Sequence, residues 1–174
     1  MDLKGKNIVV GVTGGIACYK ACELVSTLVK SGANVDVIMT KNAERFVSRL
    51  TFETLTGNRA VTDMFERDFV YEIEHVSLAQ KAHLFVIAPA TANIIAKINR
   101  GIADDMLSTT VMATKSPVII CPAMNDGMYS NVNFQENLSG LRKKGYVIVD
   151  AAEGRLACGT VGKGRLADVS EILK

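Results

Sequence analysis

The sequence predicts an α/β fold with a three-layer, doubly wound architecture around a Rossmann- or flavodoxin-like parallel sheet. Short runs of β-branched residues alternate along the chain with segments whose apolar residues recur at helical spacing. The runs are continuously apolar, as in strands that are buried on both faces. Strands that alternate with helices in this way form parallel sheets with right-handed crossovers.

Size and composition indicate one domain that spans residues 1–174. The chain is 48% hydrophobic and 22% charged, and its formal charge of +2 gives no reason to expect nucleic acid or an anionic membrane as a partner. The first apolar run is too short for a signal peptide or a membrane span, so we expect a cytoplasmic protein.

The cysteines and histidines predict no metal site. No C-x-x-C pair is present, and these residues are scattered along the chain instead of clustering at ligand spacing. In a reducing compartment the cysteines should be free thiols. The residues concerned are Cys18, Cys22, Cys121, Cys158, His75 and His83.

The first predicted strand, over residues 7–12, leads into a glycine turn and then into a helix over about 16–30. Glycine lets the backbone approach a phosphate closely, and free N–H groups at the helix start point toward it, so the turn is a candidate anion site. Its glycine spacing matches neither the dinucleotide motif G-x-G-x-x-G nor a P-loop. Taken alone, the turn is therefore a weak signal.

The second predicted strand, Asn34–Met39, is followed by Thr40, Lys41 and Asn42. A dinucleotide-binding fold usually has an acidic residue at this place for the ribose 2′-hydroxyl. Its absence disfavours NAD, whereas the residues present suit a phosphate or the polyol and ring edge of a flavin.

The next part of the chain should contain short helices over 43–47 and 52–55, and then a charged loop over 57–74 at a candidate subunit contact. His75 comes just before a short helical stretch over 76–82. A histidine in such a position is more often a cap or a surface residue than a catalyst.

Two further buried strands end at a proline and then present an asparagine. The first, over 83–88, leads through small polar residues to Asn93, and the second, which starts at Val118, leads to Asn125. Open α/β sheets bind ligands at the carboxyl ends of their strands, so we expect the two loops to meet over one pocket. The remaining predicted elements are helices over 94–98, 104–113 and 133–144 and a strand over 146–149.

Asn125 is the most suggestive residue of these loops. Its amide offers both donors and an acceptor, which suits a carboxylate or a carbonyl-rich ring. Met124 and Met128 flank it with soft apolar surface. An ordinary strand-to-loop junction explains the same residues equally well.

The segment over 151–168 differs from the rest, because four glycines and little apolar periodicity indicate a flexible flap. Cys158 in such a flap should be exposed and close to Arg155 or Lys163, which would favour its thiolate. A mobile lid that carries an ionisable group is a common means of closing an active site. A disordered tail is the alternative.

Five motifs follow one another along the chain: GVTGGIACYK at 11–20, EIEHVSL at 72–78, APATAN at 88–93, CPAMNDGMY at 121–129 and RLACG at 155–159. In this order they resemble the homo-oligomeric flavin-containing cysteine decarboxylases, most closely the phosphopantothenoylcysteine decarboxylases, which form one half of a bifunctional coenzyme A biosynthesis protein. The resemblance covers essentially the whole chain. Five motifs in a shared order are far more specific than any one of them.

The resemblance implies FMN as the cofactor. The phosphate end of FMN would meet the glycine turn, and its flavin would meet the loops that follow the later strands. The residues implied are Gly14, Gly15 and Ile16 at the phosphate, Thr40, Asn42, Thr91, Ala92 and Asn93 along the flavin, and Ala123 against it.

The resemblance also implies decarboxylation of 4′-phosphopantothenoylcysteine to 4′-phosphopantetheine. The flavin would oxidise the substrate thiol to a thioaldehyde, so that CO2 can leave, and would then return the hydride to the enethiol. His75 would act as base or orienter at the thiol, and Asn125 would hold the carboxylate with Met124 and Met128 nearby. Cys158 would deliver the last proton from the closed flap.

The chain departs from the family pattern at four positions. Thr91 and Ile94 replace the usual Ser and Thr, and Tyr129 stands where Trp is usual. Thr160 stands where an acidic residue usually follows Ala-Cys-Gly. Tyr129 keeps an aromatic face, so we expect little change there, whereas Thr160 removes a charge near Cys158.

Other functions and several assemblies stay open at this point. One alternative is another flavoprotein of this fold, a peptidyl-cysteine decarboxylase or a flavin prenyltransferase, and another is a non-enzymatic FMN-binding regulatory subunit. The presence of both His75 and Cys158 favours catalysis. The resemblance also implies a trimer with FMN between subunits, often assembled into a dodecamer, and either a free-standing enzyme or one half of a protein with a CTP-dependent synthetase domain.

Overall fold

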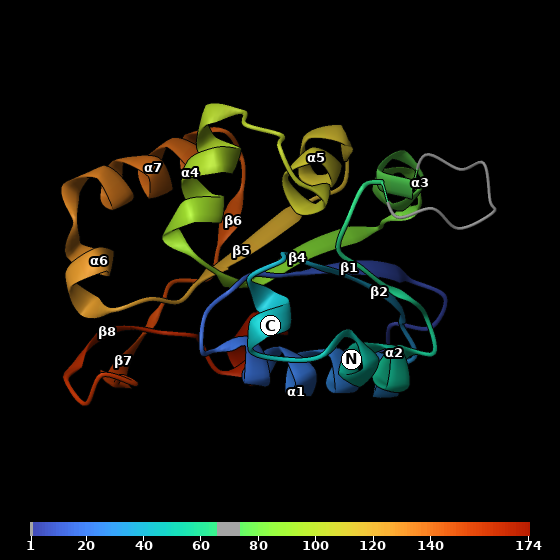
Figure 1. The fold of residues 1–174 in the computed structure, drawn as a ribbon, viewed down its shortest axis with the longest axis horizontal. Helices are drawn as coiled ribbons and strands as arrows, with labels where there is room; N and C mark the ends of the chain where they lie inside the picture. The colour runs from blue at the N-terminus through green and yellow to red at the C-terminus, as the bar shows by residue number, and fades with distance from the viewer. Residues whose placement is uncertain (1, 66–73) are drawn as a thin grey trace.

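The computed structural model describes residues 2–65 and 74–174. In these residues a six-stranded parallel sheet is covered by helices on both faces (Figure 1). This architecture confirms the predicted three-layer α/β class.

The order of the strands in the sheet is β3-β2-β1-β4-β5-β6. The chain moves outward from β1 to β3 and then returns to place β4 on the other side of β1, so the winding direction reverses between β1 and β4. Loops that leave neighbouring strands in opposite directions open a crevice at the carboxyl ends of those strands. The strands are β1 (Asn7–Val12), β2 (Asn34–Met39), β3 (Ala60–Val61), β4 (Leu84–Ala90), β5 (Val118–Pro122) and β6 (Val147–Ile148).

Each face of the sheet packs against its own set of helices (Figure 1). Side chains alternate between the faces along a strand, and in β1 Val10 joins one core whereas Val9 joins the other. Helices α1 (Cys18–Lys30), α2 (Arg49–Thr56) and α8 (Val169–Ile172) contribute to the first core. Helices α3 (Glu74–Lys81), α4 (Ala92–Arg100), α5 (Met106–Ala113) and α7 (Val132–Lys143) contribute to the second.

The structure adds short elements that the apolar pattern did not predict. These are β3 and α6 (Asp126–Ser130) directly after Asn125, whereas the short helix expected over 43–47 is the 3₁₀ helix η1 (Ala43–Arg45). The segment predicted to be a flap contains an antiparallel hairpin of β7 (Ala152–Arg155) and β8 (Val161–Arg165). Hairpins and single turns depend on backbone hydrogen bonds, which leave little apolar periodicity to read.

Strand β4 is longer than predicted. It continues past Ala88 through Pro89 to Ala90, which pairs with Pro122 of β5 after a shift in register. Of the loop predicted over 57–74, residues 66–73 lie outside the described part of the chain. Every helix in the described ranges falls short of the length and apolar character that a transmembrane span requires.

Helix α2 offers a matched test of this packing, because Phe52 is fully buried in the first core whereas Leu50 is 68% exposed. We predict that Phe52→Ala lowers the free energy of unfolding by about 3–5 kcal/mol, because it leaves a cavity. Leu50→Ala should change it by less than about 0.5 kcal/mol. Urea denaturation followed by circular dichroism measures both, and equal losses would contradict the orientation of α2.

Candidate functional site

Two adjoining cavities open at the carboxyl edge of the sheet. The first, of about 800 Å³, lies among the start of α1, the loops after β4 and β5 and the β7–β8 hairpin. The second, of about 580 Å³, lies beside the loop that follows β2. Both volumes are typical of small-molecule sites. The two cavities share Gly14, Thr91, Ala92 and Met128 in their walls.

The structure gathers all but one of the residues singled out in the sequence around these cavities. Gly15, Ile16, Ala123, Met124, Asn125 and Cys158 line the first cavity, Thr40, Asn42 and Asn93 line the second, and the shared wall supplies Gly14, Thr91, Ala92 and Met128. The loops after β4 and β5 therefore meet over one pocket, as their prolines and asparagines predicted.

Thr13, which the sequence analysis passed over, joins two turns of the site. Its buried hydroxyl donates to the carbonyl of Pro89 at 2.7 Å and accepts from the N–H of Thr91 at 3.0 Å. The Cys18 thiol donates to the Thr13 carbonyl at 2.9 Å, and burial raises the pKa of this thiol, so it stays protonated. A polar threonine at the end of an apolar strand, directly before two glycines, was the available signal.

The glycine turn after β1 lies directly against the loop after β2. A Cβ at Gly14 would overlap the Cβ of Asn42, so only glycine permits this approach. The N–H of Gly15 already donates to the Thr13 carbonyl at 2.9 Å, whereas no group in the described chain accepts from the N–H of Gly14 or Ile16. These two amides are among the donors available to an anion at the start of α1.

Asn125 is the N-cap of α6, and this role fixes its amide. The Oδ1 atom accepts from the N–H groups of Gly127 at 2.9 Å and Met128 at 3.4 Å. The Nδ2 atom is therefore directed toward Asp126 Oδ1 at 2.9 Å and Cys158 Sγ at 3.5 Å. With its acceptor engaged, Asn125 presents donors to the cavity, which suits a carboxylate better than a donor group.

The hairpin is docked onto the loop after β5 by a backbone contact. The N–H of Met124 donates to the carbonyl of Gly164 at 2.9 Å. Gly164 has φ +154°, and a Cβ there would overlap the carbonyl oxygen of Met124. The close approach of the two backbones therefore depends on glycine at this position.

Tyr129 of α6 forms a second contact with the hairpin. The Nζ atom of Lys163 lies 5.4 Å from the centroid of the Tyr129 ring, within the range of a cation–π interaction. The Tyr129 hydroxyl donates to Asp150 at 3.0 Å, and burial together with this carboxylate raises the pKa of Tyr129 to about 12. The phenol thus stays neutral and keeps its aromatic face toward the hairpin.

Cys158 is exposed at the tip of the hairpin, inside the first cavity. Its Sγ lies 3.1 Å from Thr160 Oγ1, and the hydrogen bonds of Thr160, followed by that of Asn125, lower the pKa of the thiol. From the sequence we expected Arg155 or Lys163 to favour the thiolate, but the hydrogen bonds of Thr160 and Asn125 lower this pKa. Burial has the opposite effect at Cys121, whose pKa is raised to about 12.

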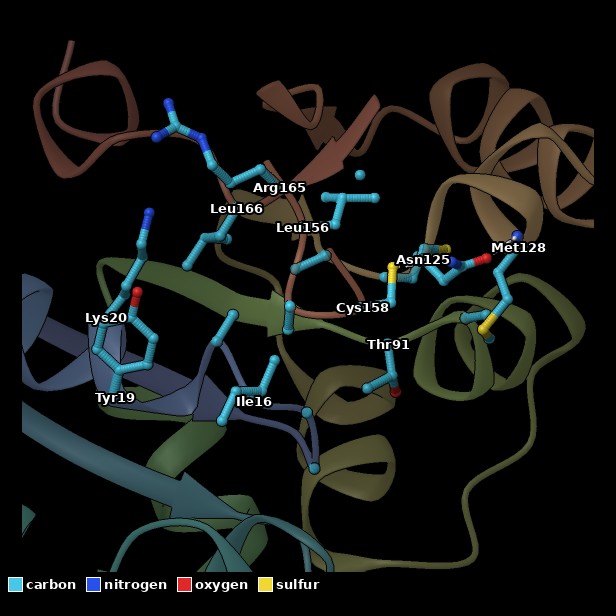
Figure 2. Close-up of a pocket in the computed structure, with 18 of the residues that line it drawn as sticks. Ile16, Tyr19, Lys20, Thr91, Asn125, Met128, Leu156, Cys158, Arg165 and Leu166 are labelled. Carbon is cyan, nitrogen blue, oxygen red and sulfur yellow. Dashed lines mark hydrogen bonds between the residues drawn. The ribbon is translucent and has the colours of Figure 1, made fainter. Parts of the chain in front are cut away.

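The far end of the first cavity is cationic. Figure 2 shows Lys20 and Arg165 on the side opposite Cys158 and Asn125. Asp168, which is not among the lining residues, lies 3.9 Å from Lys20 and 3.2 Å from Arg165. In the described chain, the charged residues that line this cavity are all cations, namely Lys20, Arg155 and Arg165.

Apolar side chains separate the two polar ends of this cavity. Ile16, Leu156 and Leu166 lie between them in Figure 2. Sequence analysis missed Lys20, which lies in the first turn of α1 and lines the cavity together with Ile16 just before that helix. The first cavity thus combines an amide and a thiol at one end, an apolar middle and cations at the other end.

His75 is the predicted residue that the structure leaves apart. It lies in the first turn of α3, half-buried, and does not line either cavity. Helix α3 is at the opposite end of the sheet from α6 and the hairpin (Figure 1). One copy of the described chain therefore does not bring His75 together with Asn125 and Cys158.

Comparison with known proteins shows that this chain is similar to flavoproteins. The family model described as Flavoprotein matches residues 1–174. The coenzyme A biosynthesis bifunctional protein CoaBC of Bacillus subtilis is 50% identical over 172 residues, which are 99% of this chain and 42% of that protein. The CoaBC of Borreliella burgdorferi is 43% identical over 98% of this chain and 44% of its own length. The chain thus spans less than half the length of these relatives.

Two solved structures share the fold over nearly the whole chain. The FMN-dependent cysteine decarboxylase SpaF has a TM-score of 0.87 and 32% identity, with 98% of this chain and 94% of that one covered. A phosphopantothenoylcysteine (PPC) decarboxylase mutant, C175S, in complex with pantothenoylaminoethenethiol has a TM-score of 0.86 and 26% identity, with coverages of 96% and 93%.

The two glycines of the turn provide a test of the site. A Cβ at Gly14 overlaps Asn42, whereas one at Gly15 meets only Thr91 Cγ2 at an ordinary 3.8 Å. We predict that Gly14→Ala pushes the loop after β2 away and lowers the melting temperature of the flavin-free protein by several degrees, roughly the effect of 1–3 kcal/mol of overpacking. Gly15→Ala should change it by about one degree or less. Calorimetry of both variants measures this, and a loss at Gly15 alone would contradict the turn geometry.

Proposed function

The chain belongs to the Flavoprotein family, and we propose that it decarboxylates 4′-phosphopantothenoylcysteine to 4′-phosphopantetheine with FMN as its cofactor. One observation carries the proposal. A single cavity has amide and thiol donors at one end and cations at the other, with apolar walls between them. This substrate has a carboxylate and a thiol at one end and a phosphate monoester at the other.

The residues around the cavities suit FMN. The wall shared by the two cavities includes Gly14, Thr91 and Ala92, whose small size allows a flat ring to lie close to the backbone. The free amides of Gly14 and Ile16 would bind its phosphate, and Thr40, Asn42 and Asn93 would reach its polar edges, with Ala123 on the other side. Bound FMN supplies reversible hydride transfer, through which a thiol can be oxidised to a thioaldehyde and an enethiol reduced.

Asn125 and Cys158 have separate tasks in the proposed reaction. Asn125 binds the substrate carboxylate through Nδ2, because capping of α6 engages its Oδ1. A cysteine carboxylate loses CO2 once its β-carbon has been oxidised, because the thioaldehyde accepts the electrons of the breaking bond. Cys158 then transfers its thiol proton to the substrate carbon that lost CO2. Met124 and Met128 provide the apolar wall beside this end.

The rest of the substrate fits the rest of the cavity. Lys20 and Arg165 would bind the phosphate by charge-assisted hydrogen bonds, and Ile16, Leu156 and Leu166 would contact the apolar pantoyl part. The cationic end favours a phosphorylated substrate over the terminus of a peptide. This feature separates the proposed activity from peptidyl-cysteine decarboxylation.

The position of His75 supports a homo-oligomer. One chain leaves His75 away from the cavities, so we place the helix α3 of a neighbouring copy against the cavity of the first. There His75 would act as base or orienter at the substrate thiol. The assembly would be a trimer, alone or within a dodecamer, in the cytoplasm, and the chain would work beside a CTP-dependent synthetase domain, free-standing or as one half of a longer protein.

The direct test is conversion of the substrate by the purified FMN-loaded protein. We expect release of one CO2 per 4′-phosphopantetheine formed, without added nicotinamide or metal. Mass spectrometry of the product and trapping of CO2 measure the two. FMN binding without CO2 release would refute the proposed substrate and favour a regulatory subunit.

The cationic end predicts selectivity for the phosphate. We predict that Lys20→Gln lowers the ratio of kcat/KM for the phosphorylated substrate to that for pantothenoylcysteine by about 10- to 100-fold, the worth of a hydrogen bond between charged groups. Lys30→Gln, in the last turn of the same helix and outside both cavities, is the matched control. An unchanged ratio in Lys20→Gln would exclude Lys20 from phosphate binding.

A site shared between copies predicts complementation. His75→Asn and Cys158→Ser should each form no 4′-phosphopantetheine alone, because each homo-oligomer lacks one group at every site. When the two variants are unfolded, mixed and refolded together, some sites should receive wild-type groups from both copies. We predict recovery of about a quarter of the wild-type rate of 4′-phosphopantetheine formation in an equal mixture, by random pairing of neighbours. No recovery would place His75 and Cys158 of one chain in the same site.

A further inference from the structure

We propose that Thr160 is a positioning residue for Cys158, whose hydroxyl holds the thiol and then stabilises the thiolate left when the proton has been delivered. This inference rests on the proposed function, in which Cys158 is the proton donor. It concerns the position at which the chain departs from the acidic residue usual in the family that it resembles.

The tip of the hairpin sets the spacing of the two side chains. The N–H of Leu156 donates to the carbonyl of Thr160 at 2.8 Å, and the N–H of Gly159 donates to the carbonyl of Leu156 at 2.9 Å. These bonds close a tight turn in which Cys158 Sγ lies 3.1 Å from Thr160 Oγ1. The contact is thus built into the backbone of the tip.

A hydroxyl can serve both protonation states of the sulfur. The thiol can donate its proton to Thr160 Oγ1, and the thiolate can accept a hydrogen bond from the same oxygen. The second bond is charge-assisted and therefore stronger, which favours loss of the thiol proton. In the step itself the S–H bond breaks and a C–H bond forms at the substrate carbon, while the electron pair of the S–H bond stays on sulfur. Thr160 keeps its own proton throughout.

Thr160 is the partner that remains when substrate binds. Asn125 Nδ2 also lies 3.5 Å from Cys158 Sγ, but in the proposed reaction this group turns to the substrate carboxylate. Among the described residues, Asp126 of α6 accepts from Asn125 at 2.9 Å, and Arg155 of β7 lines the same cavity as the thiol. An acidic side chain at position 160 would add a like charge beside the thiolate, whereas the hydroxyl adds a neutral donor.

The test compares Thr160→Val, which removes the hydroxyl, with Thr160→Ser, which keeps it. Alkylation of Cys158 by iodoacetamide in the FMN-loaded protein, without substrate, is followed across pH by mass spectrometry. We expect Thr160→Val to slow alkylation at neutral pH on the order of tenfold and to move the profile to higher pH, and Thr160→Ser to retain the wild-type profile. Thr54→Val removes an exposed hydroxyl of α2 and is the matched control.

A second readout links the contact to turnover. With substrate, Thr160→Val should slow the return of the absorbance of oxidised flavin on the order of tenfold, with CO2 release less affected, and Thr160→Ser should restore it. A wild-type alkylation profile in Thr160→Val would overturn the inference, as would equal defects in both variants. Because alkylation needs no substrate, a failure of the proposed decarboxylase function would be seen separately, as absence of CO2 release in the wild-type protein.

Discussion

The hydrogen bonds of the buried Thr13 hydroxyl hold the site at the point where the sheet reverses its winding. They connect the turn after β1 with the carbonyl of Pro89 and the N–H of Thr91 at the end of β4. Without this hydroxyl the part-buried N–H of Thr91 would lose its hydrogen-bond partner, which costs free energy, and the carbonyl of Pro89 would keep only the N–H of Thr13 at 3.3 Å. The loop after β2 packs against the first of these turns at Gly14, and the loop after β5 forms another wall of the cavities.

The second half of the site depends on a different contact, the docking of the β7–β8 hairpin on the loop after β5. Gly164 allows its backbone to meet Met124, and Asn125 next to it caps α6 and aims its Nδ2 at Cys158. A single loop thereby orients the amide that would bind the carboxylate and the flap that carries the thiol. Asn125 and Cys158, which would act on the same end of the substrate, are thus positioned by two adjacent residues, Met124 and Asn125.

The sequence predicted the sheet and most of the cavity walls, because buried parallel strands and the glycine turn leave strong local patterns. Asn125 and Cys158 could be named for their chemistry, yet the capping role of Asn125 depends on α6, which is too short to leave a helical period. Lys20 and Arg165 are separated by most of the chain and meet only through the fold. The cause of the lowered pKa of Cys158 was likewise invisible, because it is a contact of 3.1 Å at the tip of a turn.

In the proposed reaction the substrate is oxidised and, through Cys158, reduced again within one cavity. The most direct measurement is an anaerobic single turnover of Cys158→Ser beside the wild-type protein, with flavin absorbance and CO2 followed together. We expect both proteins to release one equivalent of CO2, and the flavin to return to its oxidised spectrum only in the wild-type protein. Full recovery of oxidised flavin and formation of 4′-phosphopantetheine by the variant would contradict the account.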